Sequence, residues 1–507
     1  MSNIQIRLAS LLLRENYGEI VEKVGSYLIK YGLKALRAIA LDTNLKLDQV
    51  RKALCVLITH NMAKFTSTKR GIIYYQVSVK TVLLLSRYPR YIYSVKTLYG
   101  DAGELIVEEI LQNGQLLMSK VVRKVTERLN EALEDRTVEE SFVRDKFIDL
   151  VSTHFLQRVV NPPSDIDSTV TESETAIEEE DLYKIPEAMK IEGCISRKRR
   201  RSEDEDRGTK RIRTDSTASE DPSESFPDDG VYWHTNFDRF HQHLRDQAII
   251  DAVSRRVDKI GAEIVRTMLR MSELTTDPKA TLTKPMSSHE IFHALSRELN
   301  IPRPTLDQYL KLLADDQIDF INKTGESGGG IYVINIYKAI KSLCIAHIES
   351  VVQERFGSKC YRIFRLLLLK QHLEQKQVEE FAMIPAKEAK ELLYQMFSEH
   401  FVSVQEIPRT PDHAPSRTFY LFSVNLNQVC RMLLERCYKT NANLIARREH
   451  DTYENRRLLE RSQRIEAVVA ASLRNNDGNP EQTAELEEMI TPPERAQLNK
   501  LKHNVNK

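Results

Sequence analysis

The stretch from Leu33 to Val79 constrains the fold most, because its pattern recurs three more times along the chain. Residues 33–41 predict a short helix, residues 42–44 a polar turn, and residues 47–60 a second helix with apolar residues three and four apart. Apolar and polar residues then alternate on both sides of Lys69-Arg70-Gly71, which predicts a β-hairpin with a basic tip. Helix, turn, helix and hairpin is the order of a winged helix-turn-helix module.

The later modules follow the same order. Leu306-Asp307-Gln308 opens a helix at the place where Leu47-Asp48-Gln49 does in the first module, which favours an internal repeat. The further elements expected are helices over 105–111, 121–129 and 137–151 with a strand from 155; helices over 287–295 and 306–313 with strands 318–322 and 331–336; and helices over 361–373, 378–384 and 385–397 with strands 401–404 and 418–422.

The sequence therefore predicts a mainly α fold with small β wings (α+β), in which four tandem winged-helix domains precede a C-terminal coiled coil. Residues 425–477 contain no Gly or Pro and carry an imperfect apolar seam, which fits either one long helix or a two-helix coiled-coil hairpin. The expected boundaries are 1–100, 101–245, 246–338 and 339–424 for the winged domains, 425–475 for the coiled coil and 476–507 for a flexible tail.

Residues 164–229 differ in composition from the rest of the chain. Ser, Thr, Asp and Glu dominate, so this segment has too little apolar surface to offset the entropy of ordering. We expect a disordered acidic and basic insertion within the wing of the second module. Its basic clusters resemble a bipartite nuclear localisation signal, although a solvated, charge-balanced segment is the alternative. The clusters contain Arg197, Lys198, Arg199, Arg200, Arg201, Lys210, Arg211 and Arg213.

Composition limits the classes of function. A net charge of +1 means that any nucleic-acid contact must come from local basic patches. The 6 cysteines include no C-x-x-C pair and predict reduced thiols. The N-terminus shows no signal-peptide pattern, and no apolar run approaches the length of a membrane span, so we expect a soluble intracellular protein.

One motif suggests metal chemistry. His289-Glu290-Ile291-Phe292-His293 is a literal H-E-x-x-H, in which two histidines four apart on a helix could share a zinc ion. The downstream ligand patterns of zinc peptidases are not evident, and Glu290 with Ser287 forms a predicted helix-capping box. Phosphate-binding loops and nucleophile elbows also do not stand out. We therefore expect no catalytic residues, no metal and no cofactor.

Binding remains as the function. In the first module the positions of Arg51, Lys52, Lys64, Lys69 and Arg70 suit contact with DNA phosphates. The alternative is that the modules dock proteins, and three acidic residues in the third module favour it there: Asp307, Asp315 and Asp316. The coiled-coil seam is a second candidate docking surface, with Leu426, Val429, Leu433, Leu444, Leu458 and Ile465.

The connector Arg87-Tyr88-Pro89-Arg90-Tyr91-Ile92-Tyr93 interleaves basic residues with tyrosines. Such residues can stack on bases. The favoured interpretation is a packed connector between domains, with an irregular backbone imposed by Pro89.

Several segments together resemble the third subunit of DNA-directed RNA polymerase III. They are Gly18–Val24, Leu47–Val50 with Lys52–Leu57, Arg87–Tyr91, and Trp233 followed by Asn236, Arg239 and Phe240. The resemblance extends from about Ile4 to Asn475 and excludes the insertion. A near relative, the large subunit of transcription factor IIE, carries a cysteine zinc ribbon that is absent here.

The resemblance implies four extended winged-helix domains and a nuclear, non-catalytic subunit of the polymerase that synthesises small RNAs such as 5S rRNA and tRNA. Such subunits join two smaller polymerase III subunits in a peripheral heterotrimer on the clamp of the largest subunit. The heterotrimer supports recruitment by transcription factor IIIB and the opening of DNA, with single-stranded DNA as a candidate ligand. A free-standing winged-helix transcription regulator is the alternative function, and co-purification with polymerase subunits separates the two.

Overall fold

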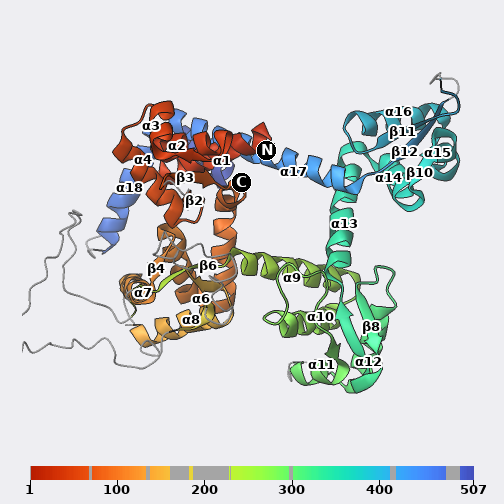
Figure 1. Cartoon of the computed structure of the whole chain (residues 1–507), viewed down its shortest axis with the longest axis horizontal. Helices are drawn as coiled ribbons and strands as arrows, with labels where there is room; N and C mark the ends of the chain where they lie inside the picture. Colours follow the sequence, from red (N-terminus) through yellow and green to blue (C-terminus); the bar gives the residue numbers. More distant parts are fainter. Residues whose placement is uncertain are drawn as a thin grey trace, which may run out of the picture. The chain divides into compact units, whose positions relative to one another are not determined.

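The structure is a computed structural model that describes residues 2–67, 71–132, 138–159, 182–185, 228, 230–295, 301–411, 418–474 and 491–506. The chain divides into two compact units, which we describe separately. One contains residues 1–58, 62–85 and 427–507, and the other contains residues 59–61 and 86–426. Figure 1 colours the chain from its N-terminus in red to its C-terminus in blue. None of the described helices is both long and apolar enough to cross a membrane.

The first and second winged modules occupy residues up to 256. The first contains α1 (Asn3–Tyr17), α2 (Glu19–Tyr31), β1 (Lys34–Ala35), α3 (Leu36–Thr43), α4 (Leu47–Thr59), β2 (Ala63–Ser67), β3 (Ile73–Val77), α5 (Val79–Leu83) and the 3-10 turn η1 (Leu84–Arg87). The second contains α6 (Tyr88–Asn113), β4 (Leu116–Leu117), α7 (Met118–Ala132), α8 (Glu140–Ser152), β5 (Leu156–Arg158), β6 (Tyr232–Thr235) and α9 (Phe237–Arg256).

The third and fourth modules and the C-terminal helices follow. The third contains α10 (Lys259–Ser272), β7 (Met286–Ser287), α11 (Ser288–Ala294), α12 (Arg303–Ala314), β8 (Ile321–Gly325), η5 (Ser327–Gly329), β9 (Ile331–Ile334) and α13 (Ile336–Phe356). The fourth contains α14 (Ser358–Lys370), β10 (His372–Glu374), α15 (Gln375–Ala382), α16 (Ala386–Ser398), β11 (Ser403–Pro408) and β12 (Thr418–Ser423). The chain ends with α17 (Leu426–Glu454), α18 (Arg456–Arg474) and α20 (Pro492–Asn506).

Each module contains one small antiparallel sheet, and all the described sheets share one strand order. The third strand of the module lies in the centre, between the short first strand and the second strand: β1-β3-β2, β4-β6-β5, β7-β9-β8 and β10-β12-β11. A short strand before the helix-turn-helix and a two-stranded wing after it define the winged helix. The predicted α+β class with four winged-helix domains is confirmed, although the short first strands were not predicted.

The same turn joins the last helix of each helix-turn-helix to the wing. A residue with positive φ precedes a buried apolar side chain in Asn61-Met62, His154-Phe155, Asp319-Phe320 and His400-Phe401. In three of these turns the amide of the apolar residue donates to the carbonyl five residues earlier, at 2.9 to 3.0 Å. Such a left-handed cap satisfies helix carbonyls that would otherwise lack donors. The turn therefore ends the helix and buries an apolar anchor in one step.

A glycine separates the first two helices of three modules. Gly18, Gly100 and Gly357 have φ of 84°, 77° and 87°, a region that residues with a Cβ rarely adopt. At Gly100 this backbone divides α6 into two helical segments. The third module uses Asp258 instead, whose side chain accepts from the amide of Gly261 at 2.6 Å. The chain can therefore reverse abruptly between two long helices.

Three of the predicted domain boundaries fall within helices. The boundary 100/101 lies in α6, 245/246 in α9 and 338/339 in α13. Each of these helices follows one sheet and precedes the next, so it belongs to both neighbouring modules. The domain boundaries remain predictions for this reason.

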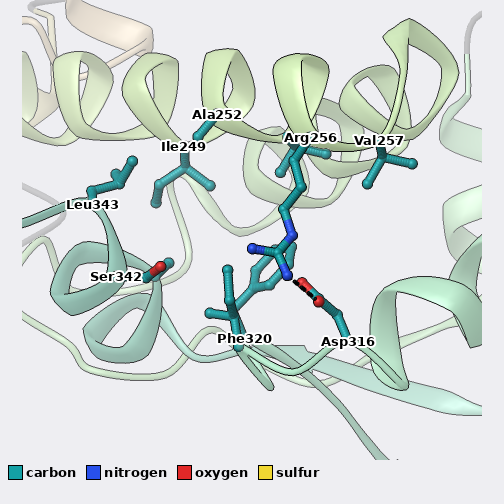
Figure 2. A pocket seen from close by; sticks show the side chains of 11 residues that line it. Ile249, Ala252, Arg256, Val257, Asp316, Phe320, Ser342 and Leu343 are labelled. Carbon is teal, nitrogen blue, oxygen red and sulfur yellow. Dashed lines mark hydrogen bonds and ion pairs between the residues drawn. The ribbon is translucent and has the colours of Figure 1, made fainter. Parts of the chain in front are cut away.

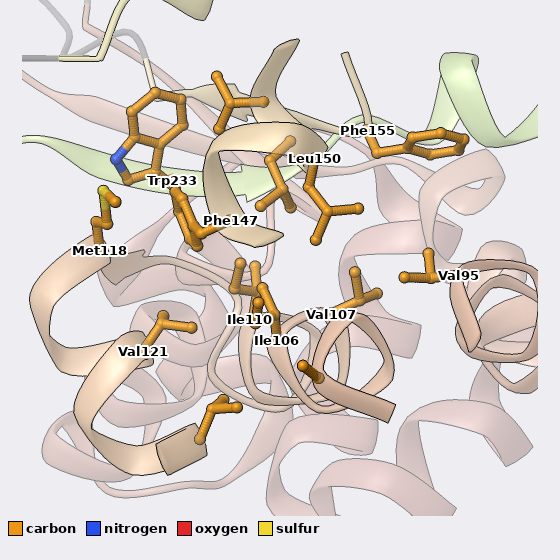
Figure 3. Close-up of a cluster of buried hydrophobic side chains, with 14 of the residues drawn as sticks. Val95, Ile106, Val107, Ile110, Met118, Val121, Phe147, Leu150, Phe155 and Trp233 are labelled. Carbon is orange, nitrogen blue, oxygen red and sulfur yellow. The ribbon is translucent and has the colours of Figure 1, made fainter. Parts of the chain in front are cut away.

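The core of the second module gathers residues from both sides of the insertion (Figure 3). Trp233 from β6 is fully buried and meets the ring of Phe147 edge-on, with centroids 5.7 Å apart. β6 pairs with β4 and β5, and the insertion lies in the sequence between β5 and β6. Such burial of large aromatic side chains makes the wing strand part of the domain core.

The insertion is anchored to this core at two places. Ile185 is 5% exposed, and Tyr183 stacks on His154 with ring centroids 3.7 Å apart. Asp228 is 2% exposed and accepts from the amide and hydroxyl of Ser119 at 2.9 and 2.8 Å, at the N-terminus of α7. The prediction of disorder throughout 164–229 is therefore wrong at residues 182–185 and at Asp228, because these side chains bury apolar surface or cap a helix.

The C-terminal helices correct a second prediction. α17 and α18 are separated only at Asn455, and α20 packs on α18 within the first compact unit. Leu498 and Leu501 of α20 are buried, and its Glu494 pairs with Arg461 of α18 at 3.0 Å. A flexible tail over 476–507 is therefore wrong for residues 492–506, where two leucines three apart form the buried face of a helix.

We predict that Ile185→Ala lowers the opening free energy of the second module by about 2 kcal/mol, because it removes a buried side chain from the core. Hydrogen exchange of the α8 and β6 amides measures this quantity. Lys184→Ala, at an exposed neighbour, serves as the control. Equal protection in the two variants would show that the segment does not contribute to the core.

Candidate nucleic-acid and partner-binding surfaces

Helix α4 is the second helix of the first helix-turn-helix. Val50, Leu54 and Leu57 are buried on one side, as the periodicity predicts, and Ala53 is buried with them. Leu47 was expected on the same stripe, but it is 39% exposed at the first turn of the helix. Arg51 and Lys52 are exposed on the opposite face, which is the face that the second helix of a winged helix presents to its partner.

Three of the residues predicted to contact DNA are exposed in the first module. Arg51 and Lys52 are exposed on α4, and Lys64 is exposed on β2. Lys52 lies 3.4 Å from Asp48, one turn earlier, but both side chains are more than 70% exposed. Such a surface pair is weak and can be replaced by a phosphate contact. Lys69 and Arg70 lie outside the described residues.

Apolar residues are exposed in the same module. Leu41 at the end of α3 is 76% exposed, Phe65 on β2 is 44% exposed and Ile73 on β3 is 42% exposed. Burial of such side chains by a partner protein would remove apolar surface from water. The first module therefore offers chemistry for both nucleic acid and protein.

The acidic residues of the third module are partly engaged within the chain. Asp307 accepts from the hydroxyl of Ser288 at 2.9 Å, and Asp316 pairs with Arg256 at 2.5 Å. Asp315 is exposed. These contacts give two of the three carboxylates structural roles, so the preference of α12 for protein remains a prediction.

The H-E-x-x-H segment lies at the start of α11. Glu290 accepts from the amide of Ser287 at 2.9 Å and donates its own amide to the Ser287 hydroxyl at 3.3 Å, so the predicted capping box is confirmed. His289 Nε2 lies 2.8 Å from a guanidinium nitrogen of Arg303. The described residues contain no group of three or more His, Cys, Asp or Glu that could hold a metal ion.

The tyrosine-rich connector is part of a helix. Pro89 lies in the first turn of α6, where proline is compatible with helical backbone, so the expected irregular backbone is wrong. Tyr88 stacks on Phe237 with centroids 5.8 Å apart, and buried Tyr91 contacts His241 Nε2 through its hydroxyl at 2.7 Å. These two tyrosines are packed within the protein, whereas Tyr93 is 66% exposed.

The C-terminal seam differs in detail from the prediction. Val429 is buried, but Leu444 is 55% exposed, and Ala442 takes the buried position two residues earlier. Leu426, Leu433, Leu458 and Ile465 are half-buried. The nuclear-signal residues 197–201 and 210–213 lie outside the described residues.

A buried arginine that the sequence analysis did not assign joins the second and third modules. Arg239 of α9 is 3% exposed and forms an ion pair with Glu273, which caps the C-terminal end of α10. Its Nε donates to the carbonyl of Thr153 at 3.1 Å, and its guanidinium lies 4.6 Å from the ring centre of Phe155. Burial lowers the pKa of Arg239 to about 10, so the group stays charged at neutral pH. In the sequence, Asn236 indicates where α9 begins, because it caps that helix. It gives no indication that Arg239 is buried.

A largely apolar hollow lies between α9, α13 and the segment before β8 (Figure 2). Ile249, Val253 and Phe320 line it, and the ion pair of Arg256 with Asp316 lies at its edge. The two charged groups bind each other, and Ser342 adds one further polar side chain to a lining that is otherwise apolar.

Four family descriptions match successive parts of this chain. "RNA polymerase III subunit RPC82 helix-turn-helix domain" matches residues 7–68, and "RNA polymerase III subunit RPC82" matches residues 145–343. "POLR3C, C-terminal winged-helix domain" matches residues 348–424. "DNA-directed RNA polymerase III subunit RPC3, helical hairpin domain" matches residues 457–507, which include α18 and α20.

Curated relatives match over the full length. The chain is 55% identical to "DNA-directed RNA polymerase III subunit RPC3" of Homo sapiens over 512 residues, which covers 100% of this chain and 95% of the relative. The protein of the same name from Danio rerio is 50% identical, with the same coverage. "DNA-directed RNA polymerase III subunit RPC-3" of Coccidioides immitis is 22% identical over 92% of this chain and 93% of the relative.

We predict that Arg239→Met lowers the stability of the joint between the second and third modules by about 3 kcal/mol, because it leaves Glu273 and the Thr153 carbonyl without their donor. Hydrogen exchange of the α9 and α10 amides, measured over a series of urea concentrations, gives the loss of stability. Arg256→Met removes a more exposed pair and should cost less than about 1 kcal/mol. Equal losses would contradict a special role for Arg239.

The same joint should respond to acid. Burial, followed by the nearby Arg239 charge, lowers the pKa of His243 to about 4, against about 6.5 in the unfolded chain. The unfolded state then binds more protons, so stability should fall as pH decreases from about 6.5 to about 4. We expect His243→Gln to flatten this dependence in thermal melts, whereas His347→Gln, at an exposed position, should leave it unchanged.

Proposed function

The chain belongs to the family of DNA-directed RNA polymerase III subunit RPC3, an accessory and not the catalytic subunit, and from this premise we propose how it acts. We propose that it docks on the polymerase clamp with two smaller subunits, and that its first module grips DNA while transcription factor IIIB recruits the complex and DNA opens. The polymerase makes small RNAs such as 5S rRNA and tRNA. The nucleus is the proposed location, with the basic clusters at 197–201 and 210–213 as the import signal.

One observation carries the DNA contact. Arg51, Lys52 and Lys64 project from the last helix of the helix-turn-helix and from the adjacent wing strand, and all three are exposed. Lys69 and Arg70 lie between β2 and β3 in the sequence, outside the described residues. In winged helices the helix enters the major groove and the wing follows the phosphate backbone. Cations on both elements are therefore placed to hold one stretch of backbone.

The small number of cations in the first module determines how strongly the chain is expected to bind DNA. A net charge of +1 gives no general attraction to DNA, so the isolated chain should bind weakly and without sequence preference. Within the polymerase, other DNA-contacting subunits hold the nucleic acid close, and a weak local grip then adds to theirs. Such a grip suits the handling of both duplex and opened single strands.

The exposed apolar residues of the first module support a second role. Leu41, Phe65 and Ile73 would be buried by a neighbouring subunit or factor rather than by phosphate. The seam residues Leu426, Leu433, Leu444, Leu458 and Ile465 remain the proposed docking surface of the C-terminal helices, whereas buried Val429 is not available to a partner. A free-standing regulator would not explain these surfaces, and the named relatives are polymerase subunits.

We predict that the triple variant Arg51→Gln, Lys52→Gln and Lys64→Gln weakens binding to every DNA sequence and lowers the slope of log K against log salt. The slope should fall by about 0.9 for each lost duplex phosphate contact, and by about 0.7 for a single strand. Fluorescence anisotropy across a salt series measures both values on the full chain and on the assembled polymerase.

A charge-matched control separates local contact from general charge. Lys311→Gln, Lys341→Gln and Lys439→Gln remove three exposed cations elsewhere and should leave the slope unchanged. An unaltered slope in the first triple variant would show that this module docks protein instead.

A further inference from the structure

The turn between α15 and α16 in the fourth module displays two large apolar side chains. Met383 is 86% exposed and Phe381 is 54% exposed. Their neighbours Ala382 and Ile384 are buried, at 1% and 6% exposure. The backbone is therefore anchored on one side while it presents Phe381 and Met383, which we call the α15–α16 knob, on the other.

The backbone of Met383 is also in an unfavourable conformation. Its φ and ψ are 53° and 50°, in the left-handed region. The corresponding turn of the first module, between α3 and α4, has Asn44 at φ 54° and ψ 33°. Asn tolerates this region because its short polar side chain can hydrogen-bond locally, whereas other side chains cost on the order of 1 kcal/mol there.

Met383 thus has both a strained backbone and an exposed apolar side chain, and packing within the fold explains neither feature. An Asn would meet the backbone requirement, as the first module shows, and would be polar in water. A solvated side chain of 86% exposure also has little packing to lose within the chain. Strain and apolar exposure at the same position indicate a function in binding.

We propose that the α15–α16 knob inserts into an apolar pocket, bordered by carboxylates, on another subunit of the polymerase. The charge around the knob suggests the acidic border. Lys370 Nζ lies 5.9 Å from the ring centre of Phe381, and Lys387 and Lys390 are exposed in α16 with no ion pair in the described part of the chain. Cations beside an apolar anchor complement a pocket with an acidic rim.

Two of the acidic side chains near the knob have partners within the chain. Glu388 pairs with Lys359, and Glu379 accepts from Gln375 at 2.9 Å. Glu380 and Glu391 remain exposed. Met383 is apolar and offers no ring for base stacking, so protein is favoured over nucleic acid. The inference rests on the family assignment and is independent of the DNA contact proposed for the first module.

The variant Met383→Asn tests the knob without harming the fold. It places at this turn the residue that the first module uses, so the melting temperature of the full chain should stay the same or rise. Purified polymerase III depleted of this subunit should bind the variant about tenfold more weakly than the natural chain, because one apolar side chain is no longer buried. Leu274→Asn, at a residue 51% exposed in the third module, should change neither quantity.

Two further measurements identify the partner. A photo-crosslinking amino acid at position 383 in the assembled polymerase should join a protein subunit, and Lys387→Gln with Lys390→Gln should reduce the salt dependence of association. Unchanged affinity of Met383→Asn, a lower melting temperature, or crosslinks to nucleic acid alone would each overturn the proposal. Failure of the natural chain itself to bind the depleted polymerase would instead contradict the family role.

Discussion

The left-handed turn that closes each helix-turn-helix is the feature on which the rest of the structure depends. It places a large apolar side chain directly after the helix: Met62, Phe155, Phe320 or Phe401, none more than 5% exposed. In three modules the carbonyl of this residue accepts from the amide that follows the central strand, at 2.6 to 2.9 Å. One residue thereby fixes the end of the helix, the start of the wing and the return of the chain. The surfaces proposed for binding are held in place by this anchor.

Continuity between modules comes from helices rather than linkers. α9 leaves the sheet of the second module and enters the third, and Arg239 binds the end of α8 and the end of α10 at once. Ion pairs of this kind contribute little net stability relative to apolar packing, but they fix geometry because a broken pair is costly. The ion pair of Arg239 therefore helps to fix the arrangement of the second and third modules.

Much of the fold could be predicted from the sequence because the helices are long and periodic. The hairpin of the third module was expected from Ile318, yet β8 begins at Ile321, because Asp319 occupies the left-handed turn. The pair of a polar residue and a large apolar one is too short a signal to recognise without coordinates. The anchors at Ile185 and Asp228 were missed because they lie in polar sequence. Asp228 also contacts a residue, Ser119, that lies 109 positions earlier in the chain.

The candidate sites were less predictable than the fold. Exposure of Arg51, Lys52 and Lys64 follows from helical and strand periodicity, so it could be foreseen. Arg239 carried no such signal, because an arginine in a polar stretch of helix is normally solvated. Likewise, Met383 reads as an ordinary core residue until its backbone and exposure are known. Function that depends on departures from a pattern is visible only in three dimensions.

The hydrogen bond between Val159 and Tyr232 holds together the two ends of the long insertion, at 2.8 Å. The anchors at Ile185 and Asp228 lie inside this insertion, so the fold keeps the same contacts whatever number of residues lies between those two anchors. Each doubling of that number adds only about 0.6 kcal/mol of closure entropy. The length and sequence of this stretch can therefore change during evolution at small energetic cost. New localisation signals or regulatory sites can arise there while the surrounding domain stays unchanged.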